Sequence, residues 1–180
     1  MNSGVVHSIR DAKGLWRLGK ANITMKKSNP TTTKLPHTLV GVSGEYFVAA
    51  ELSRRGYVAS ITLRNTRGVD ILATNSKASK HVSIQVKTNT SGKRCWILNE
   101  KAESDSSKSH FYVFVNLKNC GQLPEYFILP SEVVADFVRE DYRQWISQKG
   151  RNGKAHMDNP VRQFRNPDDM YRDNWELLGL

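Results

Sequence analysis

Two strand-like runs joined by a polar linker constrain this chain more than any other feature. The runs cover residues 69–73 and 81–87 and are rich in Val, Ile and Leu, while the residues between them are small and polar, as in a hairpin turn. Side chains alternate between the two faces of a strand, so Gln85 and Lys87 share one face. Antiparallel pairing of the runs would place the carboxylate of Asp70 beside them.

These three side chains have the chemistry that phosphodiester hydrolysis needs. Carboxylate and amide oxygens bind hard divalent cations. A bound cation lowers the pKa of water and neutralises charge on the phosphoryl oxygens, while an ammonium group stabilises the charge that develops on the phosphate. Asp70, Gln85 and Lys87 therefore form a candidate catalytic site, with the alternative that Gln85 is simply an exposed strand residue.

Neighbouring motifs extend this pattern into a resemblance to a known family. Residues 41–45 have a Gly-x-x-x-Glu spacing that ends in Glu45, and residues 67–73 read Arg-Gly-Val-Asp-Ile-Leu-Ala. With the Gln-x-Lys of residues 85–87, this ordered set resembles the PD-(D/E)xK nuclease superfamily, in the variant where Gln replaces the second acid. It is similar to archaeal-type Holliday-junction resolvases and type IV restriction endonucleases, over residues 38–135.

The resemblance implies a fold, a cofactor and roles for individual residues. The fold is α/β and restriction-endonuclease-like, with a mixed central β-sheet flanked by helices in an α-β-β-β-α-β-like order. The cofactor is Mg²⁺ or Mn²⁺, held by Asp70, Gln85, the carbonyl of Val86 and Glu45, while Lys87 orients the attacking water. The catalytic residues are then Glu45, Asp70, Gln85 and Lys87. Because Gln85 is uncharged, metal affinity should be weaker than with Glu.

Residues beside these motifs are candidates for contacts with nucleic acid. Loops next to strand-borne sites often carry binding residues, and the candidates here are Arg64, Arg67, Thr88, Asn89, Lys93 and Arg94. The alternative for the arginines is that they are ordinary exposed loop charges. Trp96 either stacks on a nucleobase or, as is commoner, packs on a sheet face.

The overall charge agrees with a polyanion as partner. The chain has 180 residues, a formal net charge of +10 and a pI of about 9.8, which favours nucleic acid over a membrane surface. DNA is the expected substrate on the resemblance, and RNA is the alternative. Because the sequence has no long apolar run and no signal peptide, it predicts a cytoplasmic protein without a membrane span. Its two cysteines, Cys95 and Cys120, lack metal-ligand spacing and are expected to be reduced thiols.

Charge and hydrophobic pattern predict three segments. Residues 1–36 hold seven Lys or Arg residues against one Asp, a net charge of +6, and are expected to form a flexible basic arm with a short helix around residues 10–18. Residues 37–148 form the nuclease-like core, and residues 149–180 form a C-terminal extension that packs on it. Within the core, a helix capped by Ser43 is expected to run to Arg55.

The other core elements follow from apolar runs and breakers. Strands are expected over residues 57–63, 111–117 and 125–129, and a helix over residues 131–147. A homodimer is also expected, because a double-strand cut needs two sites and one short chain offers one.

Three functions are consistent with this sequence. The first is a metal-dependent DNA endonuclease in restriction, repair or mobile-element maintenance. The second is a nuclease-fold module that binds nucleic acid without cutting it. The third is a regulatory partner or a subunit of a larger nuclease, which the basic arm disfavours. The presence of Glu45, Asp70 and Lys87 together favours the first, since a site without catalysis would have no need of all three.

Overall fold

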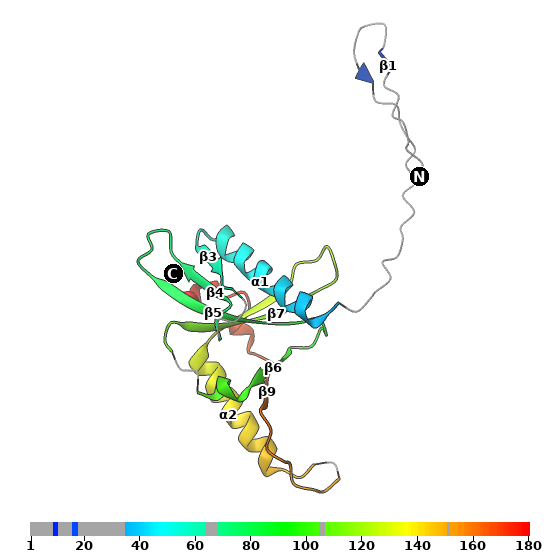
Figure 1. Ribbon diagram of the computed structural model, residues 1–180, viewed down its shortest axis with the longest axis vertical. Helices are drawn as coiled ribbons and strands as arrows, with labels where there is room; N and C mark the ends of the chain where they lie inside the picture. The colour runs from blue at the N-terminus through cyan, green and yellow to red at the C-terminus, as the bar shows by residue number, and fades with distance from the viewer. Residues whose placement is uncertain (1–8, 11–15, 18–34, 64–67, 105–106, 151) are drawn as a thin grey trace. The chain divides into compact units, whose positions relative to one another are not determined.

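The computed structural model describes residues 9–10, 16–17, 35–63, 68–104, 107–150 and 152–180 (Figure 1). The chain divides into two compact units, residues 1–34 and residues 35–180. In the first unit, β1 (Ile9–Arg10) pairs antiparallel with β2 (Trp16–Arg17). The helix expected around residues 10–18 is therefore wrong at these residues, because they form extended, paired backbone. The rest of the predicted basic arm lies outside the described residues.

A five-stranded mixed sheet forms the centre of the second unit. Its strand order is β3-β4-β5-β7-β8. Only β5 and β7 run parallel, and the other neighbouring pairs are antiparallel. The bounds are β3 (Val58–Ile61), β4 (Ile71–Thr74), β5 (His81–Asn89), β7 (His110–Asn116) and β8 (Glu125–Pro130).

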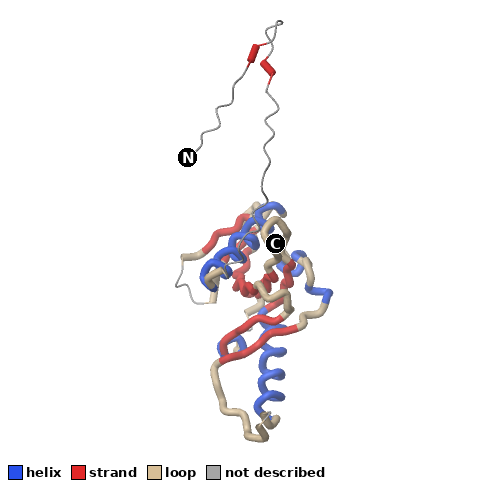
Figure 2. Tube along the Cα trace, turned by 90° about the vertical axis from the view of Figure 1, so that its right-hand side faces the viewer, coloured by secondary structure: helices blue, strands red, loops and turns tan. Residues whose placement is uncertain are grey.

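Helices flank this sheet, which confirms the predicted mixed α/β fold class. One face carries α1 (His37–Arg54). The other carries α2 (Ser131–Ser147) and a two-stranded sheet of β6 (Cys95–Asn99) and β9 (Val161–Arg165). Figure 2 shows the long helix α2 lying alongside these two strands. No helix in the described part of the chain is long and apolar enough to cross a membrane.

The crossover between β5 and β7 contains β6 followed by the short 3-10 helix η1 (Glu100–Glu103), which takes the place of the helix expected there. The segment around η1 is polar and serine-rich, so it lacks the apolar stripe that a longer crossover helix would bury. The helix α2 follows β8. Two further 3-10 helices, η2 (Asp169–Tyr171) and η3 (Trp175–Leu178), follow β9.

The prediction that Ser43 caps the first helix is wrong. The helix begins seven residues earlier, after Pro36, whose carbonyl oxygen accepts hydrogen bonds from the amides of Leu39 and Val40 at 3.0 and 3.1 Å. The Ser43 hydroxyl instead donates to the Leu39 carbonyl at 2.7 Å, one turn back inside the helix. Pro36 begins the helix because its fixed φ, here −54°, fits a helix start and no amide is lost there.

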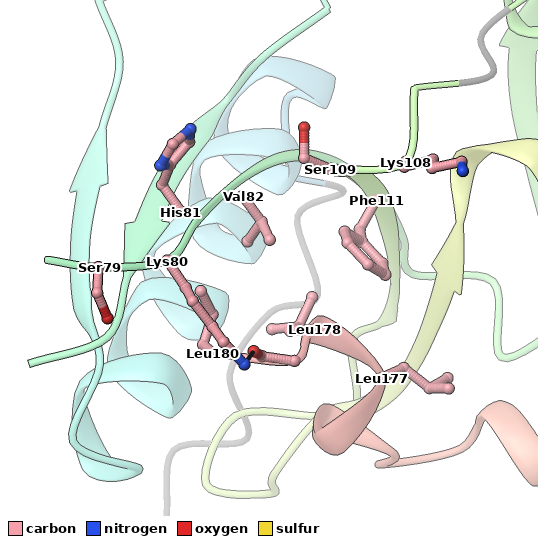
Figure 3. Close-up of a pocket in the computed structure, with 11 residues that line it drawn as sticks. Ser79, Lys80, His81, Val82, Lys108, Ser109, Phe111, Leu177, Leu178 and Leu180 are labelled. Atoms are coloured by element: carbon pink, nitrogen blue, oxygen red, sulfur yellow. Dashed lines mark hydrogen bonds between the residues drawn. The ribbon is translucent and has the colours of Figure 1, made fainter.

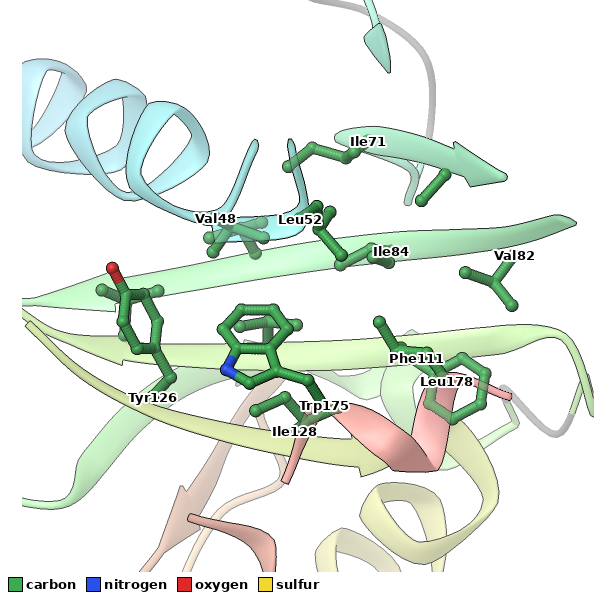
Figure 4. Packing of buried hydrophobic residues seen from close by; sticks show 14 residues of the cluster. Val48, Leu52, Ile71, Val82, Ile84, Phe111, Tyr126, Ile128, Trp175 and Leu178 are labelled. Atoms are coloured by element: carbon green, nitrogen blue, oxygen red, sulfur yellow. The ribbon is translucent and has the colours of Figure 1, made fainter. Parts of the chain in front are cut away.

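Two hydrophobic clusters lie on opposite faces of the sheet. Val48 and Leu52 of α1 pack on Ile71 and Ile84, and Trp175 and Leu178 of η3 complete this cluster (Figure 4). The second cluster joins α2, β6 and β9 to the side chains of β7 and β8 that face the other way, and it includes Trp96, Phe114, Phe127 and Phe164. The last thirty residues are thus part of both cores through β9 and η3.

Strand β9 was not expected from the sequence. Its side chains alternate between exposed and buried, and Phe164 is 2% exposed against the rings of Phe114 and Phe137 at 4.5 and 4.9 Å. The pattern in the sequence, Val-Arg-Gln-Phe-Arg, hides this alternation because the buried Arg162 reads as a surface residue.

Candidate active site

Asp70 lies at an irregularity in the sheet, immediately before β4. Its amide donates to the carbonyl of Ile84 in β5 at 2.9 Å, while its carbonyl accepts from the amide of Thr62 on the other side at 2.9 Å. In a regular strand the amide and carbonyl of one residue point to the same side. Ile71, the next residue, is also registered against Ile84, so two residues oppose one and Asp70 occupies a β-bulge. Bulges re-aim a side chain, and this one places the Asp70 carboxylate over β5.

The carboxylate is held by the backbone of β5. Its Oδ2 atom accepts a hydrogen bond from the amide of Val86 at 2.7 Å, so the side chain continues the ladder that β4 began. Val86 lies between Gln85 and Lys87, and its carbonyl points to the same side as its amide, toward Asp70. The structure therefore places the Asp70 carboxylate on the backbone of Val86, between Gln85 and Lys87.

Gln85 and Lys87 extend from the face of β5 opposite to α1. Ile84 and Val86 are buried in the cluster under α1, so the alternate residues lie on the other face. On that face Gln85 and Lys87 are in register with the buried Tyr112 and Phe114 of β7 and are themselves only partly exposed. The motif therefore borders the second hydrophobic cluster, which restricts the access of water to it.

Lys87 is affected by this burial and by the neighbouring acid. Desolvation lowers the pKa of the ammonium group below its usual value, and the charge of Asp70 partly opposes this shift. For the charge of Asp70 to act on the pKa of Lys87, the carboxylate and the ammonium must lie near each other. A partly buried lysine with a lowered pKa beside a carboxylate is suited to orient a water molecule.

Asp70→Asn is expected to lower the pKa of Lys87 further. Asn keeps an oxygen for the Val86 amide but removes the negative charge that favours the ammonium form. The measurement is an NMR titration of the Lys87 side chain in both proteins. An unchanged or raised pKa for Lys87 would show that Asp70 does not act on it.

Glu45 approaches this end of the sheet from the α1 side. The preceding residue, Gly44, packs so closely on β5 that a Cβ atom there would lie 1.9 Å from the Thr88 hydroxyl oxygen. Thr88 follows Lys87 directly, so α1 holds Glu45 next to the end of the Gln-x-Lys motif. Because β4 begins at Ile71, opposite Ile84, it does not cover the later residues of β5, and groups from the two faces of the sheet can meet there.

Thr88 and Asn89, predicted to contact DNA, have structural roles in this conformation. The Thr88 hydroxyl is buried beneath Gly44 and has no hydrogen-bond partner among the described residues. The Asn89 amide nitrogen donates to the carbonyls of Lys93 and Cys95, both at 3.0 Å, and its oxygen accepts from the Ser91 amide at 3.1 Å. Asn89 thus shapes the turn that carries Lys93, which is exposed.

The remaining predicted nucleic-acid residues divide into two groups. Arg94 donates to Asp169 at 2.8 Å and to Glu125 at 3.4 Å, and its guanidinium lies 4.9 Å from the Phe127 ring centre, so it ties the loop to the core. Arg64 and Arg67 lie outside the described residues. Trp96 is 2% exposed and its indole donates to the Val115 carbonyl at 3.0 Å, which confirms packing on the sheet rather than stacking on a base.

An ion-pair centre next to the motif was missed by sequence reasoning. Glu125, at the start of β8, contacts Arg94, Lys118 and Arg172 at 3.4, 3.7 and 3.2 Å and accepts from Asn116 at 3.3 Å. Asn116 is registered against Asn89, so this centre braces the loop after β5. An acid that opens a buried strand was the available signal, because burying such a charge requires partners.

A pocket at the opposite end of β5 is separate from this site. It has a volume of about 430 Å³ and is lined by Lys80, His81, Lys108 and the C-terminal residues Leu177 to Leu180 (Figure 3). Lys80 donates to the Gly179 carbonyl at 2.8 Å. His81 and Lys87 are six residues apart on one strand, roughly 20 Å at the rise of a β-strand. This pocket therefore does not include the predicted catalytic residues.

The metal-binding capacity of the site rests on oxygen atoms. Among the described residues, no group of three or more His, Cys, Asp or Glu side chains comes together. The Asp70 carboxylate lies on the Val86 amide, and the other candidate oxygens are the Val86 carbonyl, the Gln85 amide and the carboxylate of Glu45, which follows Gly44 in α1. Hard oxygen ligands of this type suit Mg²⁺ or Mn²⁺. The donor set thus fits the predicted cation, with two acids and not three.

Comparisons with known proteins found similarity in structure only. No protein-family profile and no curated protein matches this chain. Its fold is similar to that of two nucleases, and one is a bacterial homing endonuclease (12% identity, TM-score 0.48, covering 80% of this chain and 92% of that one). The other is Hjc, a Holliday junction resolvase from Archaeoglobus fulgidus (13% identity, TM-score 0.40, covering 73% and 91%). At these values we infer function from this chain's own residues.

Proposed function

We propose that this chain is a metal-dependent endonuclease that hydrolyses phosphodiester bonds in DNA. The observation that carries the proposal is the bulge at Asp70, which seats a carboxylate on the backbone amide between Gln85 and Lys87. A hydrophobic core has no structural need for an acid, an amide and a half-buried ammonium at one strand end. In a site that hydrolyses a phosphodiester, the acid and the amide can hold a cation, and the ammonium can stabilise the negative charge on the phosphate.

The residues divide the chemical tasks between them. Asp70, the Val86 carbonyl and Gln85 would hold Mg²⁺ or Mn²⁺, with Glu45 completing the shell directly or through water. When bound, the cation supplies charge neutralisation at the phosphate and acidifies water. Lys87 would orient the attacking water and stabilise the negative charge that grows on the phosphoryl oxygens. The fixed Asp70–Val86 contact keeps this arrangement in place before the substrate arrives.

The net charge supports a nucleic acid as the substrate. The net charge of +10 attracts a polyphosphate backbone, and the exposed Lys93 in the turn after β5 is a candidate phosphate contact, together with Arg64 and Arg67. We propose DNA rather than RNA as the substrate, in restriction, repair or mobile-element maintenance, and a homodimer for double-strand cutting. We also propose that the protein is cytoplasmic and that the basic arm over residues 1–36 contributes to the attraction of the phosphate backbone.

Cleavage assays with Mg²⁺, with Mn²⁺ and with EDTA test the proposal directly. Supercoiled, linear and single-stranded DNA serve as substrates, with structured RNA as comparison. We expect nicking or cutting of DNA that requires the metal and stops with EDTA. Salt-sensitive DNA binding without any cleavage would instead support the second candidate, a binding module. The uncharged Gln85 and the presence of two acids rather than three favour that candidate.

Gln85→Glu is expected to tighten metal binding. The substitution gives the cation a second full negative charge near Asp70 without lengthening the side chain, so we expect the apparent Kd for Mn²⁺ to fall about tenfold, equivalent to about 1.4 kcal/mol. Calorimetric titration of Mn²⁺ in the absence of DNA measures this. The control is Gln163→Glu, which adds the same charge at an exposed position of β9 and should leave the apparent Kd for Mn²⁺ unchanged. Equal affinities in wild type and Gln85→Glu would remove Gln85 from the metal shell.

A further inference from the structure

A second pocket lies away from the proposed catalytic site, between the later turns of α2 and strand β9. Its volume is about 550 Å³, and the residues that matter for its chemistry are Tyr142, Trp145, Asn159, Arg162 and Gln163. A pocket of this size can take a ligand of nucleotide dimensions. None of its aromatic residues belongs to either hydrophobic cluster, so they are not needed to fill a core.

One wall of the pocket carries the Tyr142 and Trp145 rings, which belong to a series of stacked planar groups that continues beyond the pocket to His156. The Tyr142 and Trp145 rings are 5.7 Å apart and tilted by 32°, and the His156 ring stacks on Trp145 at 4.2 Å with an angle of 29°. The Arg162 guanidinium covers the Tyr142 ring, 3.3 Å from its centre. Partly exposed rings in this arrangement offer faces and edges on which another flat ring can stack.

The other wall is the edge of β9 that pairs with no strand in the described part of the chain. The amide of Asn166 donates to the Arg94 carbonyl at 2.8 Å, and the amide of Glu100 donates to the Pro160 carbonyl at 2.9 Å. These two bonds fix the ladder, so the even-numbered residues of β9 direct their backbone groups to β6. Gln163 then directs its amide and carbonyl away from β6, and its exposed side-chain amide adds a further donor and acceptor. A strand edge of this kind presents adjacent donors and acceptors.

The charged groups of the pocket are already paired. Arg165 pairs with Asp141, Arg162 with Glu103, and the Tyr142 hydroxyl with Asp158. A neutral lining does not favour a phosphate or a charged side chain. It favours an uncharged flat ring with hydrogen-bonding groups along its edge, which is the chemistry of a nucleobase.

We propose that the pocket between α2 and β9 binds a single unstacked nucleobase. The ring would lie against Trp145 and Tyr142 while its edge pairs with the backbone and side chain of Gln163. That the base belongs to a nucleotide displaced from the base stack of DNA rests on the proposed function. Binding of a free nucleotide is independent of the proposed function, because it requires neither metal nor cleavage.

Titration of the protein with 5′-dAMP in EDTA tests the pocket. Binding is followed by calorimetry and by the indole N–H signal of Trp145 in the NMR spectrum, assigned with Trp145→Phe. Ribose 5-phosphate, which carries the phosphate without the base, is the matched ligand. We expect dAMP to bind and to shift the Trp145 signal, and ribose 5-phosphate to do neither.

Variants identify the contacts. Trp145→Ala should weaken dAMP binding about tenfold, the loss typical of one stacked base, while Trp145→Phe retains most of it. Gln163→Ala should weaken it less, and Gln144→Ala, on the exposed side of α2, should leave it unchanged. Equal binding of the two ligands, binding of dAMP that leaves the Trp145 signal in place, or no binding of dAMP would each overturn the proposal. If DNA cleavage fails in its own assay while dAMP still binds here, only the proposed catalytic function falls.

Discussion

Lys87→Ala is expected to reduce DNA cleavage by about 10²- to 10³-fold, the loss typical when one preorganised group that stabilises transition-state charge is removed. Lys87 is the half-buried ammonium of the site, and the field of Asp70 acts on it. The substitution leaves the Asp70–Val86 hydrogen bond intact because that bond uses the backbone. Single-turnover cleavage at saturating protein, with and without Mg²⁺, measures the loss.

Lys93→Ala is the matched control for this experiment. It removes the same charge six residues further along, from an exposed side chain in the turn after β5. We expect weaker DNA binding and a shallower salt dependence, with a cleavage rate at saturation close to that of the wild type. If Lys87→Ala cuts as fast as Lys93→Ala, the site lies elsewhere.

Gly44→Ala is expected to lower the free energy of unfolding by about 3 kcal/mol, the upper part of the range for overpacked sites. The added Cβ would lie 1.9 Å from the Thr88 hydroxyl oxygen and 2.9 Å from the Thr88 Cβ, so helix and strand must separate. Val48 and Leu52, which lie on the same helix face, would lose contact with the sheet. Urea unfolding monitored by circular dichroism measures the change.

Gly41→Ala and Thr88→Ala complete this test. A Cβ at Gly41 meets nothing within 4 Å, so the helix propensity of Ala should raise stability by about 1 kcal/mol. In the Gly44→Ala background, Thr88→Ala removes the closest atoms and should restore part of the loss. If Gly44→Ala is as stable as Gly41→Ala, the close approach of α1 to β5 does not hold in solution.

Much of the fold could be predicted from local pattern. The strands around Asp70 and Lys87, the buried strand β7 and the helix after β8 follow from apolar runs, and each was expected near its observed position. The helix start was misplaced because a Ser inside a helix can bond to the preceding turn as well as cap a new one. Strand β9 was missed because its pairing with β6 is set by distant contacts.

The candidate site was also predictable in part from local pattern. Spacing alone indicated that Asp70 meets the Gln-x-Lys run, since one hairpin connects them. It could not show the bulge at Asp70, because a bulge depends on the register of two strands, here with Asp70 and Ile71 both opposite Ile84. Nor could it separate Lys93, which is exposed, from Arg94, which is tied to Asp169 and Glu125. Neighbours in sequence can have opposite roles when only one meets a long-range partner.

The pairing of β6 with β9 has a consequence for how the chain reaches its native state. During synthesis, β6 leaves the ribosome more than sixty residues before β9 does. Until then, the edge of β6 that β9 will occupy has no partner strand, and Trp96 and Leu98 lack the cover of Phe164. An open strand edge beside apolar side chains is a template for association with other chains. Nascent or truncated forms that end before residue 161 are therefore the ones expected to aggregate or to need a chaperone.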